Sequence, residues 1–322
     1  MRQPECGFVP FGALYFPDNL PMALEFETCF DPAYGDAIKV APDVLRLTVN
    51  NPSAFTFHGT NSYIVGRSAL AVIDPGPEDE AHLRALLKAI DGRPVSHIFV
   101  SHTHRDHSPL ATHLARETGA LVCAEGPHRA ARPLRIGETN PLDASADMDF
   151  VPDRALADDE LIEGDGWAIR AIHTPGHAAN HAAFALENTG ILFSADHVMA
   201  WATSIVAPPD GAMSDYMASL DRLLARDDTV FFPGHGGRVK SPQRFMRGLK
   251  AHRKMRERAI LDRVTRGDRT IPEMVSSIYR DTDPRLHGAA ALSVLAHLED
   301  LVARGAVTTE TEPSIDAVYL PG

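Results

Sequence analysis

The sequence of 322 residues has no long uninterrupted apolar segment. It nowhere approaches the roughly 18 consecutive apolar residues that a membrane-spanning helix requires. The first six residues, MRQPEC, also lack the apolar core of a secretory signal. We therefore expect a cytoplasmic protein that has no membrane partner.

Cysteine is scarce, and the three cysteines of the chain, Cys6, Cys29 and Cys123, are widely spaced. Three scattered cysteines in a cytoplasmic protein indicate reduced thiols and no disulfide framework. None of them stands in a CxxC or CxH spacing, so we expect no metal role for them. The sequence also lacks the GxSxG pattern of a serine nucleophile.

Positive charge is in short supply overall, because the net charge is −12. This balance argues against general affinity for nucleic acid. Residues 238–258 are the exception, since they hold nine Lys or Arg and a single acid, Glu257. This basic segment has two open interpretations, a solvated helix face or a surface for a phosphate backbone.

The pattern of elements divides the chain into three parts. Residues 1–43, rich in Pro and aromatic residues, predict an irregular extension packed on the main domain. Residues 44–240 alternate short strands with helices, which is typical of an α/β domain, although 126–160 are predicted to be mostly loop. Residues 241–322 predict three helices and a short terminal β element, which fit a small winged-helix-like domain.

The most informative stretch is His-Thr-His-Arg-Asp-His at residues 102–107. It follows an apolar run at 95–100 that predicts a buried strand, so its side chains would project from a rigid scaffold into a loop. The four candidate ligands are His102, His104, Asp106 and His107. Imidazole and carboxylate together suit zinc, with iron and manganese as alternatives.

Three further candidates, His177, Asp196 and His235, each follow a predicted strand beside small or turn residues. Seven ligands divide naturally into two sites that share a bridge, because zinc takes about four ligands. His102, His104 and His177 would bind one metal, Asp106, His107 and His235 would bind the other, and Asp196 would lie between them. His173 and His197 are better explained as neighbours of the ligands.

These residues, in this order, resemble the metallo-β-lactamase superfamily of dinuclear metal hydrolases over about residues 44–240. The resemblance implies a four-layer αβ/βα sandwich with two divalent metal ions at the edge between its sheets. It also implies that Asp74 is a buried structural acid and no ligand. By this resemblance we expect a metal-bound hydroxide to attack a carbonyl carbon or a phosphorus, with Asp106 orienting the nucleophile.

Residues 51–63 and 207–216 resemble the β-lactamase-like protein 2 subfamily, which ends in a winged-helix-like domain. Similar animal proteins are described as endoribonucleases selective for single strands, so the resemblance implies a single-stranded RNA substrate. One alternative is a thioester hydrolase of the glyoxalase II (hydroxyacylglutathione hydrolase) type. Another is a metal-stabilised nucleic-acid-binding module. For the C-terminal domain we favour packing, homodimer formation or a substrate lid over DNA reading.

Overall fold

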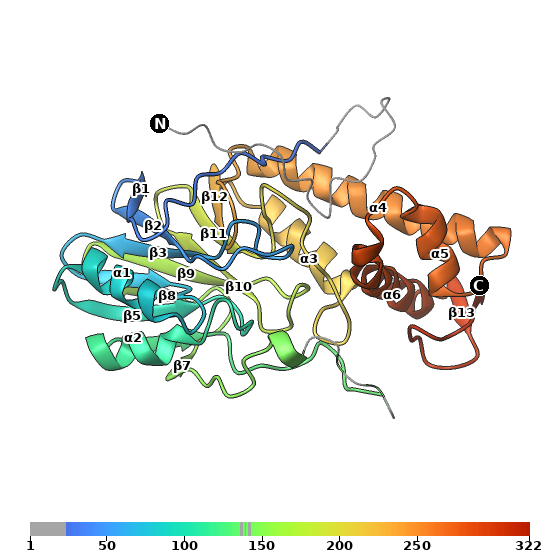
Figure 1. The fold of residues 1–322 in the computed structure, drawn as a ribbon, viewed down its shortest axis with the longest axis horizontal. Coiled ribbons are helices and arrows are strands. Elements are labelled where there is room, and N and C mark those ends of the chain that lie inside the picture. The colour runs from blue at the N-terminus through green and yellow to red at the C-terminus, as the bar shows by residue number, and fades with distance from the viewer. Residues whose placement is uncertain (1–23, 136–137, 139, 141–142) are drawn as a thin grey trace.

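The computed structural model describes residues 24–135, 138, 140 and 143–322. Two β-sheets lie face to face at the centre of the larger lobe (Figure 1). The first sheet has seven strands in chain order: β1 (Ile38–Ala41), β2 (Val44–Thr48), β3 (Asn61–Gly66), β4 (Leu70–Ile73), β5 (Val95–Val100), β6 (Leu121–Ala124) and β7 (Arg154–Ala155). The second has the order β12 (Val230–Pro233), β11 (Ile191–Ala195), β10 (Ala182–Leu186), β9 (Trp167–His173) and β8 (Leu161–Gly164).

Helices cover the outer face of each sheet, which completes the four-layer αβ/βα sandwich. The first sheet packs against α1 (Glu80–Ile90) and α2 (Leu110–Thr118) through a core that includes Ile98 and Leu114. The second sheet packs against α3 (Met213–Leu224) and the first half of α4 (Pro242–Arg266). Aromatic side chains fill the space between the sheets, as Phe184 does.

The smaller lobe contains α5 (Ile271–Ile278), α6 (His287–Ala303) and the antiparallel hairpin of β13 (Val307–Thr309) and β14 (Tyr319–Pro321). Short 3-10 turns occur at Asp143–Ser145 and Pro284–Leu286. Three helices and a hairpin form the winged-helix arrangement. Its core also receives the second half of α4, so this helix runs from one lobe into the other (Figure 1).

One segment, Pro284–Ala303, is long and apolar enough to cross a membrane by length and composition alone. It contains α6, whose Val294, Leu298 and Leu301 are buried in the core of the smaller lobe. Packing against α4 and α5 therefore accounts for its apolar character.

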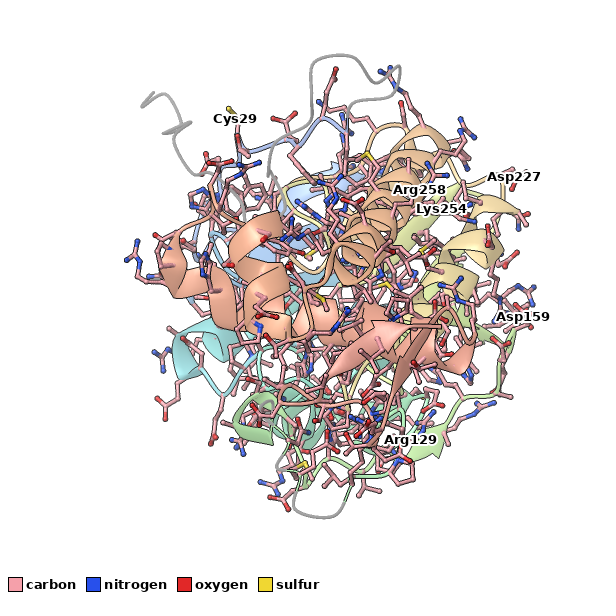
Figure 2. The ribbon with its side chains drawn as sticks, turned by 90° about the vertical axis from the view of Figure 1, so that its right-hand side faces the viewer. Cys29, Arg129, Asp159, Asp227, Lys254 and Arg258 are labelled. Carbon is pink, nitrogen blue, oxygen red and sulfur yellow. The ribbon has the colours of Figure 1, made fainter. Side chains whose placement is uncertain are left out.

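Two sequence-based expectations are wrong in the described residues. Residues 38–41 are not irregular, because β1 pairs with β2 as an edge strand. The segment 126–160 is mostly loop in the described residues, as expected, and its strand β7 has only two residues. Cys29 (labelled in Figure 2) is disulfide-bonded and not a reduced thiol, whereas Cys123 is free and buried. Cys6 lies outside the described residues.

Candidate metal centre

The seven predicted ligands come from loops that follow four strands of the two sheets. The 102–107 loop follows β5, and His177, Asp196 and His235 follow β9, β11 and β12. Both sheets therefore contribute to one site at their common edge. The structure brings all seven side chains together, although their role as ligands stays a prediction.

Three imidazoles converge on a first point. His104 Nδ1 lies 2.9 Å from His102 Nε2 and 3.0 Å from His177 Nε2. The three nitrogens lie within 4.8 Å of one another, and the three residues are buried. This group corresponds to the first of the two predicted metal sites.

A second group forms around Asp106. Its Oδ2 lies 3.4 Å from His107 Nε2 and 3.2 Å from His235 Nε2. Asp196 lies between the two groups, with Oδ2 3.7 Å from His177 Nε2 and 3.3 Å from His235 Nε2. Its Oδ1 lies 3.5 Å from His107 Nε2. Asp196 is therefore placed as the predicted bridge.

These spacings fit metal ions. Tetrahedral zinc with ligand bonds of about 2.0–2.1 Å places neighbouring ligand atoms about 3.3 Å apart. His107 Nε2 and Asp196 Oδ1 are buried without a hydrogen-bond partner among the described residues, as unfilled ligand atoms would be. A Cβ added to Gly234 would lie 2.4 Å from Asp196 Oδ1, so the glycine leaves the space that the site needs.

Outer contacts fix the orientation of two imidazoles through Asp74. Asp74 Oδ2 lies 3.0 Å from His107 Nδ1 and accepts a 2.7 Å hydrogen bond from the Ser101 hydroxyl. Ser101 Oγ in turn lies 3.0 Å from His102 Nδ1. Both Nδ1 atoms thus face acceptors, which leaves the Nε2 lone pairs directed at the centre. Asp74 is buried and has the structural position that the resemblance implies.

Backbone carbonyls orient two more of the imidazoles, those of His177 and His235. His177 Nδ1 lies 2.7 Å from the Ile205 carbonyl oxygen, and His235 Nδ1 lies 3.2 Å from that of Gly59. In the neutral imidazole each contact favours the proton on Nδ1, which leaves the Nε2 lone pair free to bind a metal.

Thr60 holds the Asp106 carboxylate from the other side. Thr60 Oγ1 lies 3.2 Å from Asp106 Oδ2, and the Asn51 side chain contacts both the hydroxyl and the backbone N–H of Thr60. This role of Thr60 and Asn51 was not predicted from the sequence. Both residues lie in the 51–63 segment, whose richness in turn and hydroxyl residues was the available signal.

Two imidazoles of the first group, those of His102 and His104, are held in the uncharged form by their surroundings. Burial, with repulsion from His107 and the other neighbouring imidazoles, holds the pKa of His102 well below its ordinary value. Burial and the proximity of His177 lower the pKa of His104 to about 3. Neutral imidazoles are the form that binds metal.

The second group carries paired charges when no metal is bound. Although burial opposes protonation of His235, Asp196 and Asp106 raise its pKa to about 9. The same carboxylates raise the pKa of His107 against the effect of burial. The pKa of Asp106 is held well below its usual range, since His107 and His235 outweigh its burial. Metal ions would replace these protons, so binding is expected to release them.

The remaining histidines near the site have other contacts. His173 Nε2 lies 3.0 Å from the Leu156 carbonyl oxygen, and the His197 ring packs 4.6 Å from Tyr216. His181 shows no ligand pattern in the sequence. Its ring centroid lies 5.1 Å from that of His102, and its Nδ1 lies 2.8 Å from Thr174 Oγ1. His181 therefore lies nearer the centre than its sequence context indicates.

Comparison with known proteins agrees with this geometry. The family model for the metallo-beta-lactamase superfamily matches residues 55–235, and that for the beta-lactamase associated winged helix domain matches residues 270–314. The chain belongs to the metallo-beta-lactamase superfamily. Members of this superfamily are metal-dependent hydrolases, so the protein is an enzyme of that class.

Individual relatives extend over most of the chain. A beta-lactamase-like protein 2 homolog from Drosophila melanogaster is 30% identical over 83% of this chain and 90% of its own length. A beta-lactamase domain protein from Burkholderia ambifaria has the same fold, with a TM-score of 0.75 and 22% identity over 93% of this chain and 97% of its own. A metallo-beta-lactamase family protein from Thermus thermophilus gives a TM-score of 0.70 and 26% identity over 88% of this chain and 100% of its own.

Proposed function

We propose that this hydrolase cleaves a thioester. Two relatives, from Cryptosporiopsis and Paecilomyces divaricatus, are named atrochrysone carboxyl ACP thioesterases. Both are 28% identical, over 78% and 77% of this chain and over 76% and 75% of their own length. That similarity is the observation that carries the proposal, because the match is long and this chain presents a seven-residue cluster that fits two metals.

The reaction adds water to the thioester carbonyl, breaks the carbon–sulfur bond and releases a carboxylic acid and a thiol. Bound divalent metal ions would supply a water of lowered pKa and polarise the carbonyl oxygen. In this proposal Asp106 would orient the attacking water by hydrogen bond, and the contacts of its carboxylate with Thr60 and with the imidazoles of His107 and His235 support that role. Burial of the cluster limits access of bulk water.

The test is a substrate panel with purified protein loaded with zinc or manganese. S-Lactoylglutathione and an acyl-N-acetylcysteamine thioester serve as thioester probes, and release of free thiol is measured. A labelled single-stranded RNA oligonucleotide serves as the phosphodiester probe. We expect thiol release that chelation abolishes, whereas cleavage of the RNA alone would overturn the thioester proposal.

A second candidate, cleavage of single-stranded RNA, is favoured by the basic helix α4. No ion pair is found among the described residues for four exposed side chains of this helix, which are Arg244, Arg247, Lys254 and Arg258. Successive helical residues turn by about 100°, so these four lie on an arc of about 80° that is about 21 Å long. Such a stripe suits a phosphate backbone.

The basic stripe lies on the face of α4 that points away from the metal cluster, which makes RNA the weaker candidate substrate. Arg253, on the buried face of α4, is about 100° to 180° around the helix from the four exposed residues. The metal cluster lies on the side of the buried face, because Arg253 contacts the loop that holds His177. Figure 2 shows Lys254 and Arg258 on α4, where both side chains are exposed.

A matched pair of variants tests the RNA candidate. Lys254→Gln with Arg258→Gln removes two charges of the stripe, and Lys88→Gln with Arg116→Gln removes two exposed charges from α1 and α2. If RNA is the substrate, only the first variant raises the KM for RNA and lowers its salt dependence. Equal behaviour of the two variants would remove the support that the stripe gives to RNA.

A further inference from the structure

Arg253 is a buried cation in a helix whose other arginines mostly face solvent. Arg253 is only 4% exposed. It lies on the α4 face that otherwise carries Met246, Leu249 and Ile260. Burying a guanidinium is costly unless its contacts compensate, so an arginine here needs an explanation beyond filling space.

The guanidinium contacts two segments of the hydrolase lobe at once. Its Nη2 donates a hydrogen bond to the Ser204 carbonyl oxygen. Its Cζ also lies 5.0 Å from the centroid of the Tyr216 ring, in a cation–π contact. The planar fork of arginine can make both contacts, whereas the ammonium of lysine is a point charge on a flexible stem.

The first contact leads directly to His177. Ser204 precedes Ile205, whose carbonyl oxygen lies 2.7 Å from His177 Nδ1. A hydrogen bond at Ser204 therefore fixes the peptide next to the one that sets the orientation of the His177 imidazole.

The second contact leads to Asp196 and again to His177. Tyr216 Oη donates a 3.2 Å hydrogen bond to the carbonyl oxygen of His197, the residue after Asp196. The Tyr216 backbone also lies against Gly176, because a Cβ added to Gly176 would be 2.3 Å from Tyr216 Cα. A shift of Tyr216 would therefore move the segments that carry both ligands.

We propose that Arg253 is a positioning residue for the metal centre. Arg253 holds His177 and Asp196 in place through its contacts with the Ser204 carbonyl oxygen and the Tyr216 ring. It touches no predicted ligand among the described contacts and acts through the two loops. The inference rests on the metal site and not on the substrate, so it stands whether the enzyme cleaves a thioester or RNA.

The experiment measures metal retention, which needs no substrate. Arg253→Gln removes the charge and the planar stack while keeping much of the volume. The control is Arg256→Gln, three residues further along α4, which removes a similar cation–π contact, 4.7 Å over the Tyr279 ring, within the smaller lobe. Zinc affinity is determined by competition with a chromophoric chelator, and thermal unfolding of the metal-free proteins is recorded beside it.

We expect Arg253→Gln to lower zinc affinity about tenfold or more, as loss of outer contacts does at other sites, while Arg256→Gln leaves it unchanged. Arg253→Lys keeps the charge but not the planar fork, so its zinc affinity should lie between those of Arg253→Gln and Arg256→Gln. It serves in place of Arg253→Gln if that variant does not fold. Wild-type zinc affinity in both Arg253 variants, with thermal stability lost as in Arg256→Gln, would overturn the proposal.

Discussion

Gly234 lies against the predicted metal centre, where there is no room for a larger side chain. A methyl group there would lie 2.4 Å from Asp196 Oδ1 and 2.7 Å from His107 Cε1. We expect Gly234→Ala to lower metal affinity at least about tenfold, because the two ligands must move apart. The control is Gly237→Ala, where the nearest atoms lie 3.9 Å away. Metal content after dialysis distinguishes them, and equal zinc retention would contradict this account of Gly234.

Asp106 is the predicted catalytic side chain. Asp106→Asn keeps the shape of the residue but removes its negative charge, so folding should be retained while turnover falls by about 100-fold or more. Asp227→Asn, at an exposed position shown in Figure 2, provides the comparison. Measuring kcat/KM together with thermal unfolding separates the two effects. Turnover near the wild-type value would remove Asp106 from the mechanism.

Local sequence indicated the candidate ligands, whose role stays a prediction, but it did not indicate the residues that support them. The 102–107 hexapeptide carries four candidate ligands in one loop, and each of the other three follows an apolar strand, so spacing alone indicated them. Arg253 belongs to a run of basic residues that all look alike in one dimension. Its distinction is its helical phase, since it stands on the face that otherwise carries Met246 and Leu249.

Among the elements, α6 carries a buried histidine with a predictable effect of pH. His297 is 2% exposed, and neither ring nitrogen has a hydrogen-bond partner among the described residues. Burial, with the charges of Arg253, Arg256 and Arg304, lowers the pKa of His297 to about 3. The neutral imidazole is therefore favoured in the folded state.

The unfolded chain binds a proton at this histidine below pH of about 6.5, while the folded chain does not until about 3. Stability should thus fall as the pH falls through this window, by about 2 kcal/mol from this group between pH 8 and 5. His297→Leu should remove that part of the pH dependence. Urea unfolding at pH 8 and 5 checks it, and an unchanged difference between the two pH values would contradict the assignment.

The edge strands β1 and β8 were not predicted from the sequence, for a physical reason. β1 has no buried residue, and β8 buries only Ile162, so neither shows the alternation that a half-buried strand produces. β5, which lies inside the first sheet, is strongly apolar, and its predicted range of 95–100 is confirmed. Elements that bury side chains are therefore easier to predict from the sequence than strands that only complete the edge of a sheet.

At the scale of the whole molecule, the two lobes should unfold together. Helix α4 places Met246 and Leu249 in the core of the hydrolase lobe and Ile260 and Val264 in that of the smaller lobe. Tryptophan fluorescence reports only the hydrolase lobe, where the two tryptophans lie, whereas far-ultraviolet circular dichroism also reports the helices of the smaller lobe. We expect coincident transitions, and two separate midpoints would show independent lobes.

Metal binding should stabilise the whole chain, because the ligands come from both sheets. Free zinc at 100 times its dissociation constant adds about 2.7 kcal/mol, which raises the Tm by about 4 °C in a protein of this size. Chelation should reverse the shift. A variant with His102→Ala and His107→Ala should show no such response, and an equal shift in that variant would place the bound metal elsewhere.

The architecture was predictable only through resemblance to a family. Alternation of strands and helices indicates an α/β domain, but it does not say that two sheets stack face to face. The order of the ligand residues carried that information, since it is characteristic of one superfamily. The matched family ranges, 55–235 and 270–314, leave the whole of α4 between them.

The span of α4 across both cores has a consequence for recombining this protein with its relatives. A chimera joined near residue 240 would replace α4, and with it Arg253, together with the wing. A chimera joined after Arg266 would keep the native helix and exchange only α5, α6 and the hairpin. The interchangeable module for engineering therefore begins after α4, about 25 residues later than the change in sequence pattern at 241 indicates.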